Sequence, residues 1–373
     1  MNFTGNLYSL RAGRSQVVKG FTIVELLVAV GITALLVASM LIVTINVINV
    51  WGRTSGSLAA GNQARLILDQ ITQDLQAAVF QRDNNVWLAA SIQGAQTTAA
   101  GDSAYSKADW TGGTNLKPNT IDVDHEYDLA SCKFGQAGVW LRFFTIPSDE
   151  NDELTDVSAP RAIAYQIIRV GLGTAPNIQY TYQLFRSEVS PMDSSVAGRS
   201  TFEIGYDLFT ADVNGYNAQD DGWSLVNPQT LGNPKKRKSN AGNIRMPNAQ
   251  QLLANDIVDF GIRFYEPDSS TPPNLIEIFP VDRRVGSAAT RGLLAVTMDT
   301  SKNQPTYGYT PGNRSYGYPT VAEVMVRILT AEGARLLQAY EENHLQTTDD
   351  WWGIVEKNSQ VYTRRIEIKA TAL

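Results

Sequence analysis

Apolar residues are distributed unevenly along the chain, and their longest uninterrupted run lies near the amino terminus. No charged residue occurs from Leu26 to Gly52, and the stretch Leu26–Ile45 reads LLVAVGITALLVASMLIVTI. As a helix, such a stretch is long enough to cross the ~30 Å hydrocarbon core of a bilayer. It exceeds the roughly 7–15 apolar residues of a secretory signal, and no small-x-small cleavage site follows it. The pattern therefore predicts a transmembrane helix over about residues 24–48.

The charges that flank this run predict its orientation. Arg11, Arg14 and Lys19 precede it, residues 1–20 contain no acid, and Arg53 is the first charged residue after it. Because positive charges are retained on the cytoplasmic side of a membrane, these leader charges predict a cytoplasmic amino terminus. The rest of the chain is then expected on the far side of a single-pass helix.

A second apolar pattern, in residues 64–80, predicts that the helix continues beyond the membrane. Apolar residues recur there at spacings of three and four, whereas the other face is polar. The stripe contains Leu68, Ile71 and Leu75. No proline interrupts residues 21–117, although three glycines weaken the middle of the segment, Gly52, Gly56 and Gly61. We therefore expect helix over residues 21–80, with an amphipathic second half.

The remainder of the chain carries strand patterns separated by polar segments. Strands are predicted at residues 138–146, 162–170, 178–189, 257–265, 322–328 and 362–370. A short helix is expected at 330–342, behind a cap at Thr330. Residues 81–120, 190–250 and 268–318 are rich in small and polar residues and indicate loops, the last two as insertions.

The sum of these elements is an α+β fold. It has a leader at 1–20, a long N-terminal helix at 21–80 and a globular domain at 81–373, in which the amphipathic half of the helix packs on an antiparallel sheet. The clearest alternation lies in 257–265 and predicts one buried and one outward face. The outward residues are Asp259, Gly261 and Arg263, and in 322–328 they are Glu323 and Arg327.

The residues just before the apolar run resemble a known signal. Gly20-Phe21-Thr22-Ile23-Val24-Glu25 is similar to the type III signal peptide of type IV prepilins and pseudopilins. The resemblance implies that a membrane aspartyl prepilin peptidase cuts between Gly20 and Phe21 and methylates the new amine of Phe21. It also implies that Glu25 pairs with the amino terminus of a neighbouring subunit during assembly.

The position of Glu25 makes physical sense under this resemblance. A carboxylate costs about 2.5–3.5 kcal/mol at the centre of a membrane helix, and less near the interface. A positive amine four residues earlier is also costly to bury alone, whereas pairing the two charges offsets much of both penalties. The alternative is that Glu25 lies at headgroup level in a simple signal anchor.

Later segments resemble the J-type minor pseudopilins of type II secretion and the related large minor pilins. The resemblance rests on the order of elements, on LLANDIVDFGIRFY at 252–265 and on RRIEI at 364–368. It implies a pilin-like fold and a protein-transport role as a minor subunit, at the tip or in low copy number, of a periplasmic filament that starts from the bacterial inner membrane. The implied partners are prepilin peptidase, other pseudopilins or pilins, the inner-membrane assembly platform and membrane lipid. The long insertions depart from the family.

Two other functions stay open at this point. One is a minor pilin of a type IV pilus that serves motility or DNA uptake. The other is a signal-anchored periplasmic binding protein that is never assembled. Processing at Gly20 separates the anchored protein from the first two.

Composition argues against an enzyme. The chain has one cysteine, Cys132, and two histidines, His125 and His344, so a disulfide framework and a multi-thiolate metal site are excluded. Phosphate-loop, nucleophile-elbow and dinucleotide motifs are missing as well. We therefore expect no catalytic residues, no cofactor and no metal centre. Cys132 and the pair Trp351–Trp352 are expected to be buried structural residues.

Charged clusters complete the candidate sites. The net charge of −6 speaks against a nucleic-acid partner, and the basic run 235–238 is expected to be a solvated loop. Acidic clusters at 122–128, 148–156 and 212–222 leave a structural calcium ion open, although none follows the EF-hand pattern. They are expected to be solvated loops.

Overall fold

The structure is a computed structural model of the full chain. It describes residues 22–80, 86–92, 115–118, 122–123, 128–136, 138–146, 160–172, 178–189, 249–268, 270–280, 293–299, 304–307 and 318–373. The chain divides into two compact units, Met1–Ser55 and Gly56–Leu373. We call the second unit the head. The boundary falls within the first helix, α1 (Ile23–Gln76), which is 54 residues long.

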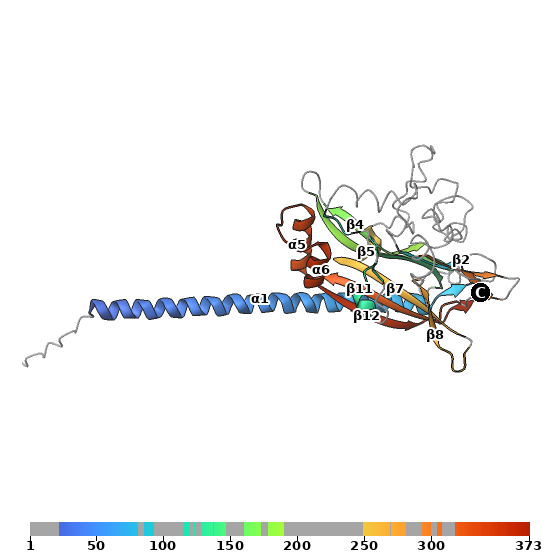
Figure 1. The fold of residues 1–373 in the computed structure, drawn as a ribbon, viewed down its shortest axis with the longest axis horizontal. Helices are drawn as coiled ribbons and strands as arrows, with labels where there is room; N and C mark the ends of the chain where they lie inside the picture. Colours follow the sequence, from blue (N-terminus) through green and yellow to red (C-terminus); the bar gives the residue numbers. More distant parts are fainter. Residues whose placement is uncertain are drawn as a thin grey trace, which may run out of the picture. The chain divides into compact units, whose positions relative to one another are not determined.

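In the first unit, α1 exposes apolar side chains on every side. Leu35, for example, is 74% exposed, and Trp51 near the end of the apolar run is 75% exposed. A helix that is apolar all round suits a membrane or a protein interior. Among the described residues, α1 is the one helix long and apolar enough to cross a membrane (Figure 1).

The larger sheet of the head has seven strands in the order β10-β9-β2-β3-β4-β5-β6, and all neighbours are antiparallel. The strands are β10 (Gln304–Tyr307), β9 (Leu293–Asp299), β2 (Val86–Ile92), β3 (Val139–Thr145), β4 (Arg161–Leu172), β5 (Gln179–Val189) and β6 (Leu252–Asn255). The hairpin of β4 and β5 has the longest register, from Ala162 opposite Val189 to Leu172 opposite Gln179.

The smaller sheet has four antiparallel strands in the order β12-β11-β7-β8. The strands are β12 (Ser359–Glu367), β11 (Val321–Leu329), β7 (Ile257–Pro267) and β8 (Leu275–Phe279). The chain passes from β6 of one sheet to β7 of the other at Asp256, which has a positive φ of 60°. A short parallel pair joins β1 (Val79–Phe80), just after α1, to β13 (Thr371–Ala372).

The described part of the head contains four helical elements besides α1. They are α5 (Ala331–Glu341), α6 (Trp351–Asn358) and the single turns η1 (Leu129–Ser131) and η6 (Ala249–Gln251). The hydroxyl of Thr330 accepts a hydrogen bond from Gly333 N at 3.0 Å and caps α5, and Asp350 caps α6 through Gly353 N at 2.7 Å.

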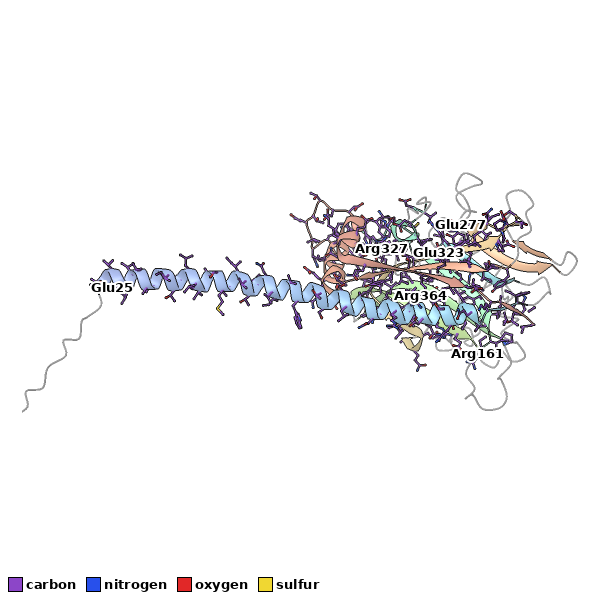
Figure 2. All side chains as sticks on the ribbon, turned by 90° about the horizontal axis from the view of Figure 1, so that it is seen from below. Glu25, Arg161, Glu277, Glu323, Arg327 and Arg364 are labelled. Atoms are coloured by element: carbon purple, nitrogen blue, oxygen red, sulfur yellow. The ribbon has the colours of Figure 1, made fainter. Side chains whose placement is uncertain are left out.

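The outer half of α1 packs between the two sheets. Its stripe is buried, and Ile67, Ile71 and Leu75 belong to the same core as both sheets. On one side, β12 lies along the helix: Ser57 accepts from Gln360, and Asp69 accepts from Arg364 (Figure 2). On the other side, Asp74 contacts β4 and β5. The predicted α+β class, with a long N-terminal helix and antiparallel sheets, agrees with this architecture.

The six predicted strands and the helix at 330–342 are confirmed as β3, β4, β5, β7, β11, β12 and α5. Two predicted loop segments are wrong in part. Residues 81–120 contain β2, and residues 268–318 contain β8, β9 and β10, so β2 and β9 lie inside the larger sheet. The other proposed insertion, 190–250, lies outside the described residues except at its end.

The predicted outward face of β7 is wrong. Asp259, Gly261 and Arg263 are all buried, as is Arg327 on the neighbouring strand β11. The segment around η1 covers them: Arg327 donates to Ala130 O at 2.9 Å, and Phe134 N donates to Asp259 at 3.2 Å. Glu323, four residues before Arg327 on β11, remains partly exposed. Figure 2 shows the two residues beside each other.

Candidate functional site: the start of the apolar helix

The predicted processing residues lie mostly outside the described part of the chain. Arg11, Arg14, Lys19, Gly20 and Phe21 belong to that group. Cleavage, methylation and the topology of the leader therefore stay predictions. Glu25 is described, and it lies in the first turn of α1.

Glu25 and Thr22 form a reciprocal cap at the start of α1. Thr22 N donates to Glu25 Oε2 at 2.9 Å, and the Thr22 hydroxyl donates to the same oxygen at 3.0 Å. In return, Glu25 N lies 3.2 Å from Thr22 Oγ1, which accepts its hydrogen. This is a capping box, which satisfies backbone N–H groups that the first turn leaves without partners. Helical bonding begins there, with Leu26 N donating to Thr22 O at 3.1 Å.

The geometry leaves part of the carboxylate available. Both hydrogen bonds that Glu25 accepts go to Oε2, so Oε1 has no partner within the described residues. The side chain is exposed, and a second donor can reach it. The sequence analysis names Thr22 only as part of the signal and does not predict this cap. The signal for it is present, because a Thr followed three residues later by a Glu is the pattern of a capping box.

Polar side chains inside the apolar run bond to their own helix. Thr33 donates to Ala29 O at 2.8 Å, Ser39 to Leu36 O at 2.8 Å and Thr44 to Met40 O at 2.8 Å. Hydrocarbon offers no hydrogen-bond partner, so polar groups in a membrane must be satisfied internally. These three hydroxyl groups are thus compatible with a lipid environment.

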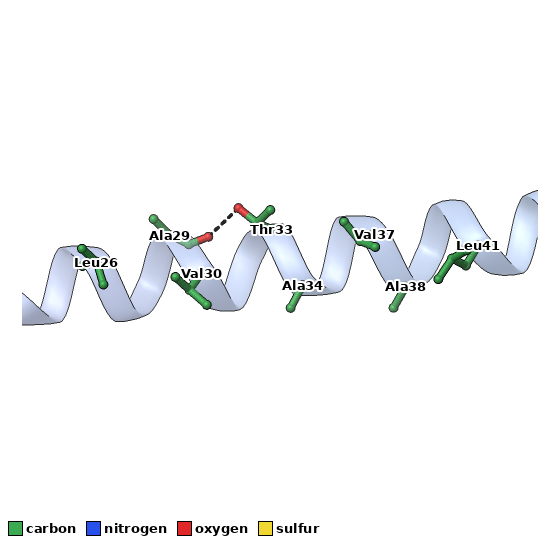
Figure 3. Close-up of a pocket in the computed structure, with 8 residues that line it drawn as sticks. All are labelled: Leu26, Ala29, Val30, Thr33, Ala34, Val37, Ala38 and Leu41. Carbon is green, nitrogen blue, oxygen red and sulfur yellow. Dashed lines mark hydrogen bonds between the residues drawn. The ribbon is translucent and has the colours of Figure 1, made fainter.

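A shallow groove follows one side of this helix (Figure 3). Small residues are part of its lining, including Ala34 and Ala38, which are four residues apart. Small residues at this spacing let membrane helices approach closely. The groove is lined by Leu26, Ala29, Val30, Thr33, Ala34, Val37, Ala38 and Leu41.

A buried ion-pair network fixes the other end of α1. Arg186 of β5 donates to both carboxylate oxygens of Asp74, at 2.6 and 2.9 Å, and the Tyr165 hydroxyl donates to Asp74 as well. Arg186 also donates a hydrogen bond to Glu188, which accepts another from Arg161. Burial opposes the charge of Arg186, but the hydrogen bonds to Asp74 outweigh it and raise the pKa of the guanidinium. The network holds the helix on the larger sheet.

A second buried carboxylate holds α5 and α6. Glu341 accepts from Arg169 Nε at 3.0 Å, from Trp351 Nε1 at 3.0 Å and from the Tyr182 hydroxyl. Burial, and then the charge of Glu341, raises the pKa of Tyr182 well above its usual value. Every contact is internal to the fold, so this cluster is a structural joint between helices and hairpin.

The tryptophan pair and the cysteine are buried, as predicted. Trp351 and Trp352 are 2% and 6% exposed, and the ammonium of buried Lys117 lies 5.4 Å from the ring centre of Trp352. Cys132 is fully buried, and Arg263 donates to its sulfur at 3.1 Å. Burial raises the pKa of the Cys132 thiol, which disfavours the reactive thiolate.

The remaining charged candidates have local roles or fall outside the described residues. Asp128 accepts from Ala130 N at 3.0 Å and from the Ser131 hydroxyl at 2.6 Å, so it caps η1. His344 is exposed beside Glu342, at 3.2 Å. His125 and the segments 148–156, 212–222 and 235–238 are outside the described part. Within that part, no group of three or more His, Cys, Asp or Glu side chains is arranged to hold a metal ion.

No family model, no curated protein and no solved structure matches this chain. The class of the protein is therefore described from its fold and from the start of its apolar helix. The chain is an α+β protein with antiparallel sheets, whose long N-terminal helix is apolar and long enough to cross a membrane once.

Proposed function

We propose that the chain is the precursor of a minor pseudopilin, a structural subunit of a type II secretion pseudopilus. The observation that carries the proposal is a carboxylate, Glu25, in the first turn of α1. It follows Gly20-Phe21 closely and precedes a stretch without any charge, residues 26–52. A charge at this position needs a partner in lipid. A cut after Gly20 creates one, the amine of Phe21, on every subunit.

Assembly follows from this pairing. Prepilin peptidase removes residues 1–20 on the cytoplasmic side and methylates Phe21. The amine of one subunit then binds Glu25 of its neighbour, and the free Oε1 offers an acceptor without breaking the cap at Thr22. The apolar helices bundle in the filament core, where the groove at Ala34 and Ala38 gives room for close approach.

The protein on this proposal acts by assembly and not by catalysis, and it needs no cofactor. Before assembly it lies in the bacterial inner membrane with its amino terminus in the cytoplasm and its head in the periplasm. Its partners are the peptidase, other pseudopilins, the assembly platform and lipid. The large head favours a position at the filament tip or a low copy number. Heads of this size are bulky for tight stacking along the shaft of a filament.

Two substitutions test the proposal. Gly20→Val should block cleavage, so that mass spectrometry finds a chain that still begins at Met1. Glu25→Ala should be cut normally, but its incorporation into filaments should fall at least tenfold by fractionation. A wild-type protein that keeps residues 1–20 in a strain with active prepilin peptidase would contradict the proposal and favour an anchored binding protein.

A matched variant separates the charge of Glu25 from its cap. Gln at the third helical position also completes a capping box, so Glu25→Gln keeps the cap and removes the charge. We expect Glu25→Gln to fail in incorporation as Glu25→Ala does. Normal incorporation of Glu25→Gln would show that the carboxylate acts only as a cap.

A further inference from the structure

Lys117 and Asp259 form a pair that is completely buried in the head. The Nζ atom of Lys117 lies 3.3 Å from Oδ1 of Asp259, and both side chains are 0% exposed. Nζ also donates a hydrogen bond to Val258 O at 2.6 Å, and Phe134 N donates one to Oδ2 of Asp259 at 3.2 Å. These contacts hold the amine against the carboxyl group, although the two residues are 142 positions apart in the sequence.

The surroundings of this pair favour the neutral forms of both groups. The ring centres of Trp351 and Trp352 lie 5.8 and 5.4 Å from Nζ of Lys117, and both rings are buried. Burial lowers the pKa of Lys117, and it raises the pKa of Asp259 against the opposing charges of Lys117 and Arg327. One proton moved from Nζ to Oδ1 therefore gives an uncharged amine beside an uncharged carboxylic acid.

An uncharged amine in contact with an uncharged carboxyl group is a reactive arrangement. A lysine amine becomes a nucleophile when an apolar site removes its charge. Two groups that a fold holds in a productive geometry react as if their concentration reached about 10⁵–10⁸ M. Condensation of an amine with an acid releases water, so a site that is closed to water also slows the reverse reaction.

We propose that Lys117 and Asp259 condense to an isopeptide bond, which joins residues 115–118 covalently to β7. The lone pair of Nζ attacks Cγ of Asp259, and Oδ2 takes up the negative charge while the N–H of Phe134 stabilises it. A second proton of Nζ passes to the Oδ1 hydroxyl, the Cγ–Oδ1 bond breaks, and one water molecule leaves. Oδ2 remains as the amide oxygen, so the step needs no oxidant, reductant or co-reactant.

The bond fixes parts of the head that come from distant regions of the chain. It closes a loop that contains β3, β4, β5 and β6, and it thereby lowers the entropy of the unfolded chain. Asn115, in the same segment as Lys117, donates to Tyr340 O of α5 at 3.1 Å, so the bond also ties α5 to the smaller sheet. Because Cys132 is the one cysteine of the chain, a disulfide within the chain cannot serve this purpose. The bond forms in the folded head whether or not the chain is assembled into a filament.

Mass spectrometry of the full chain, purified in detergent, tests the bond. We expect an intact mass that is lower than the sequence predicts by one water molecule, once cleavage and methylation at the amino terminus are taken into account. After digestion with trypsin, residues 108–133 and 246–263 should be found as one cross-linked peptide, whose fragments place the link at Lys117 and Asp259. The full calculated mass, with these two peptides separate, would show a plain ion pair and overturn the proposal.

Two variants serve as controls. Lys117→Met removes the amine but keeps a long side chain, so the peptide 246–263 should appear free and the mass of the missing water should return. Lys133→Arg should keep the link. Lys133 also has a carboxylate partner, Glu356 at 2.7 Å, but their side chains are 24% and 49% exposed, so water solvates this pair and no bond forms there. A link that persists in Lys117→Met, or one that is lost in Lys133→Arg, would overturn the assignment to Lys117.

Discussion

Two aspartates on α1, five residues apart, show how burial changes the value of an ion pair. Asp69 is 53% exposed and pairs with Arg364 and Arg65 at the helix surface. Asp74 is 8% exposed and receives two hydrogen bonds from Arg186 and one from Tyr165. Exposed pairs contribute about 0–1 kcal/mol, whereas breaking a buried pair leaves the other charge without compensation and costs about 3–5 kcal/mol.

We therefore expect Asp74→Ala to destabilise the head by about 2–3 kcal/mol, because the largely buried Arg186 loses its main partner and keeps only Glu188. The matched variant Asp69→Ala should cost less than about 1 kcal/mol. Chemical denaturation of the full chain in detergent, followed by tryptophan fluorescence, measures both. Equal losses for the two variants would contradict the role of Asp74 in holding α1.

The two acids of α1 also show what the sequence could reveal about the site. Glu25 stands out because it is the one acid next to a long apolar run. Asp74 could have been noticed as well, since it lies with Ile67, Ile71 and Leu75 on the buried stripe. An acid on an apolar stripe indicates a buried partner. Arg186 itself could not be predicted, because the pairing joins residues 112 positions apart.

At the scale of elements, strands were predictable where residues alternate or where large apolar and aromatic residues follow one another, as in β7 and β3, although both strands are buried on both faces. β7 and β11 alternate, and their positions follow from the sequence. β2 reads VWLAASI without alternation, and its described side chains are buried on both faces. A short apolar run within polar surroundings does not by itself indicate a strand. The pairing of β2 with β9 depends on contacts between distant parts of the chain.

Gly261 on β7 lies under Phe134, a residue of the segment around η1 that covers the smaller sheet. A Cβ built there would lie 2.1 Å from Phe134 Cε2, so Gly261→Ala forces the buried ring of Phe134 to move. We expect a loss of about 1–3 kcal/mol from overpacking, measured by thermal or chemical unfolding.

Gly61→Ala is the control for this substitution. Its Cβ would meet only the Tyr362 hydroxyl, at an ordinary 3.5 Å. Because alanine favours helix over glycine, Gly61→Ala should stabilise the protein by up to about 1 kcal/mol. A stabilised Gly261→Ala variant would show that Phe134 does not pack on β7 as described.

At the scale of the whole molecule, one helix serves two environments. Up to Trp51, α1 is apolar on all sides, and beyond Gly56 it is apolar on one stripe that the two sheets bury. This change of pattern is visible in the sequence, and it predicts both halves of the helix. The arrangement of eleven strands in two sheets around the outer half is not, because it depends on long-range pairing.

The proposed topology can be tested with the chain's own cysteine as background. Cys132 is buried, and its thiol has a raised pKa, so it should react little with a membrane-impermeant maleimide. Asn62→Cys places a thiol on the exposed face of α1 in the head, and Ser9→Cys places one in the leader. In spheroplasts of a strain without prepilin peptidase, the thiol at position 62 should be labelled and the thiol at position 9 should react only after the membrane is opened. Labelling at position 9 but not at 62 in intact spheroplasts would reverse the orientation that Arg11, Arg14 and Lys19 predict.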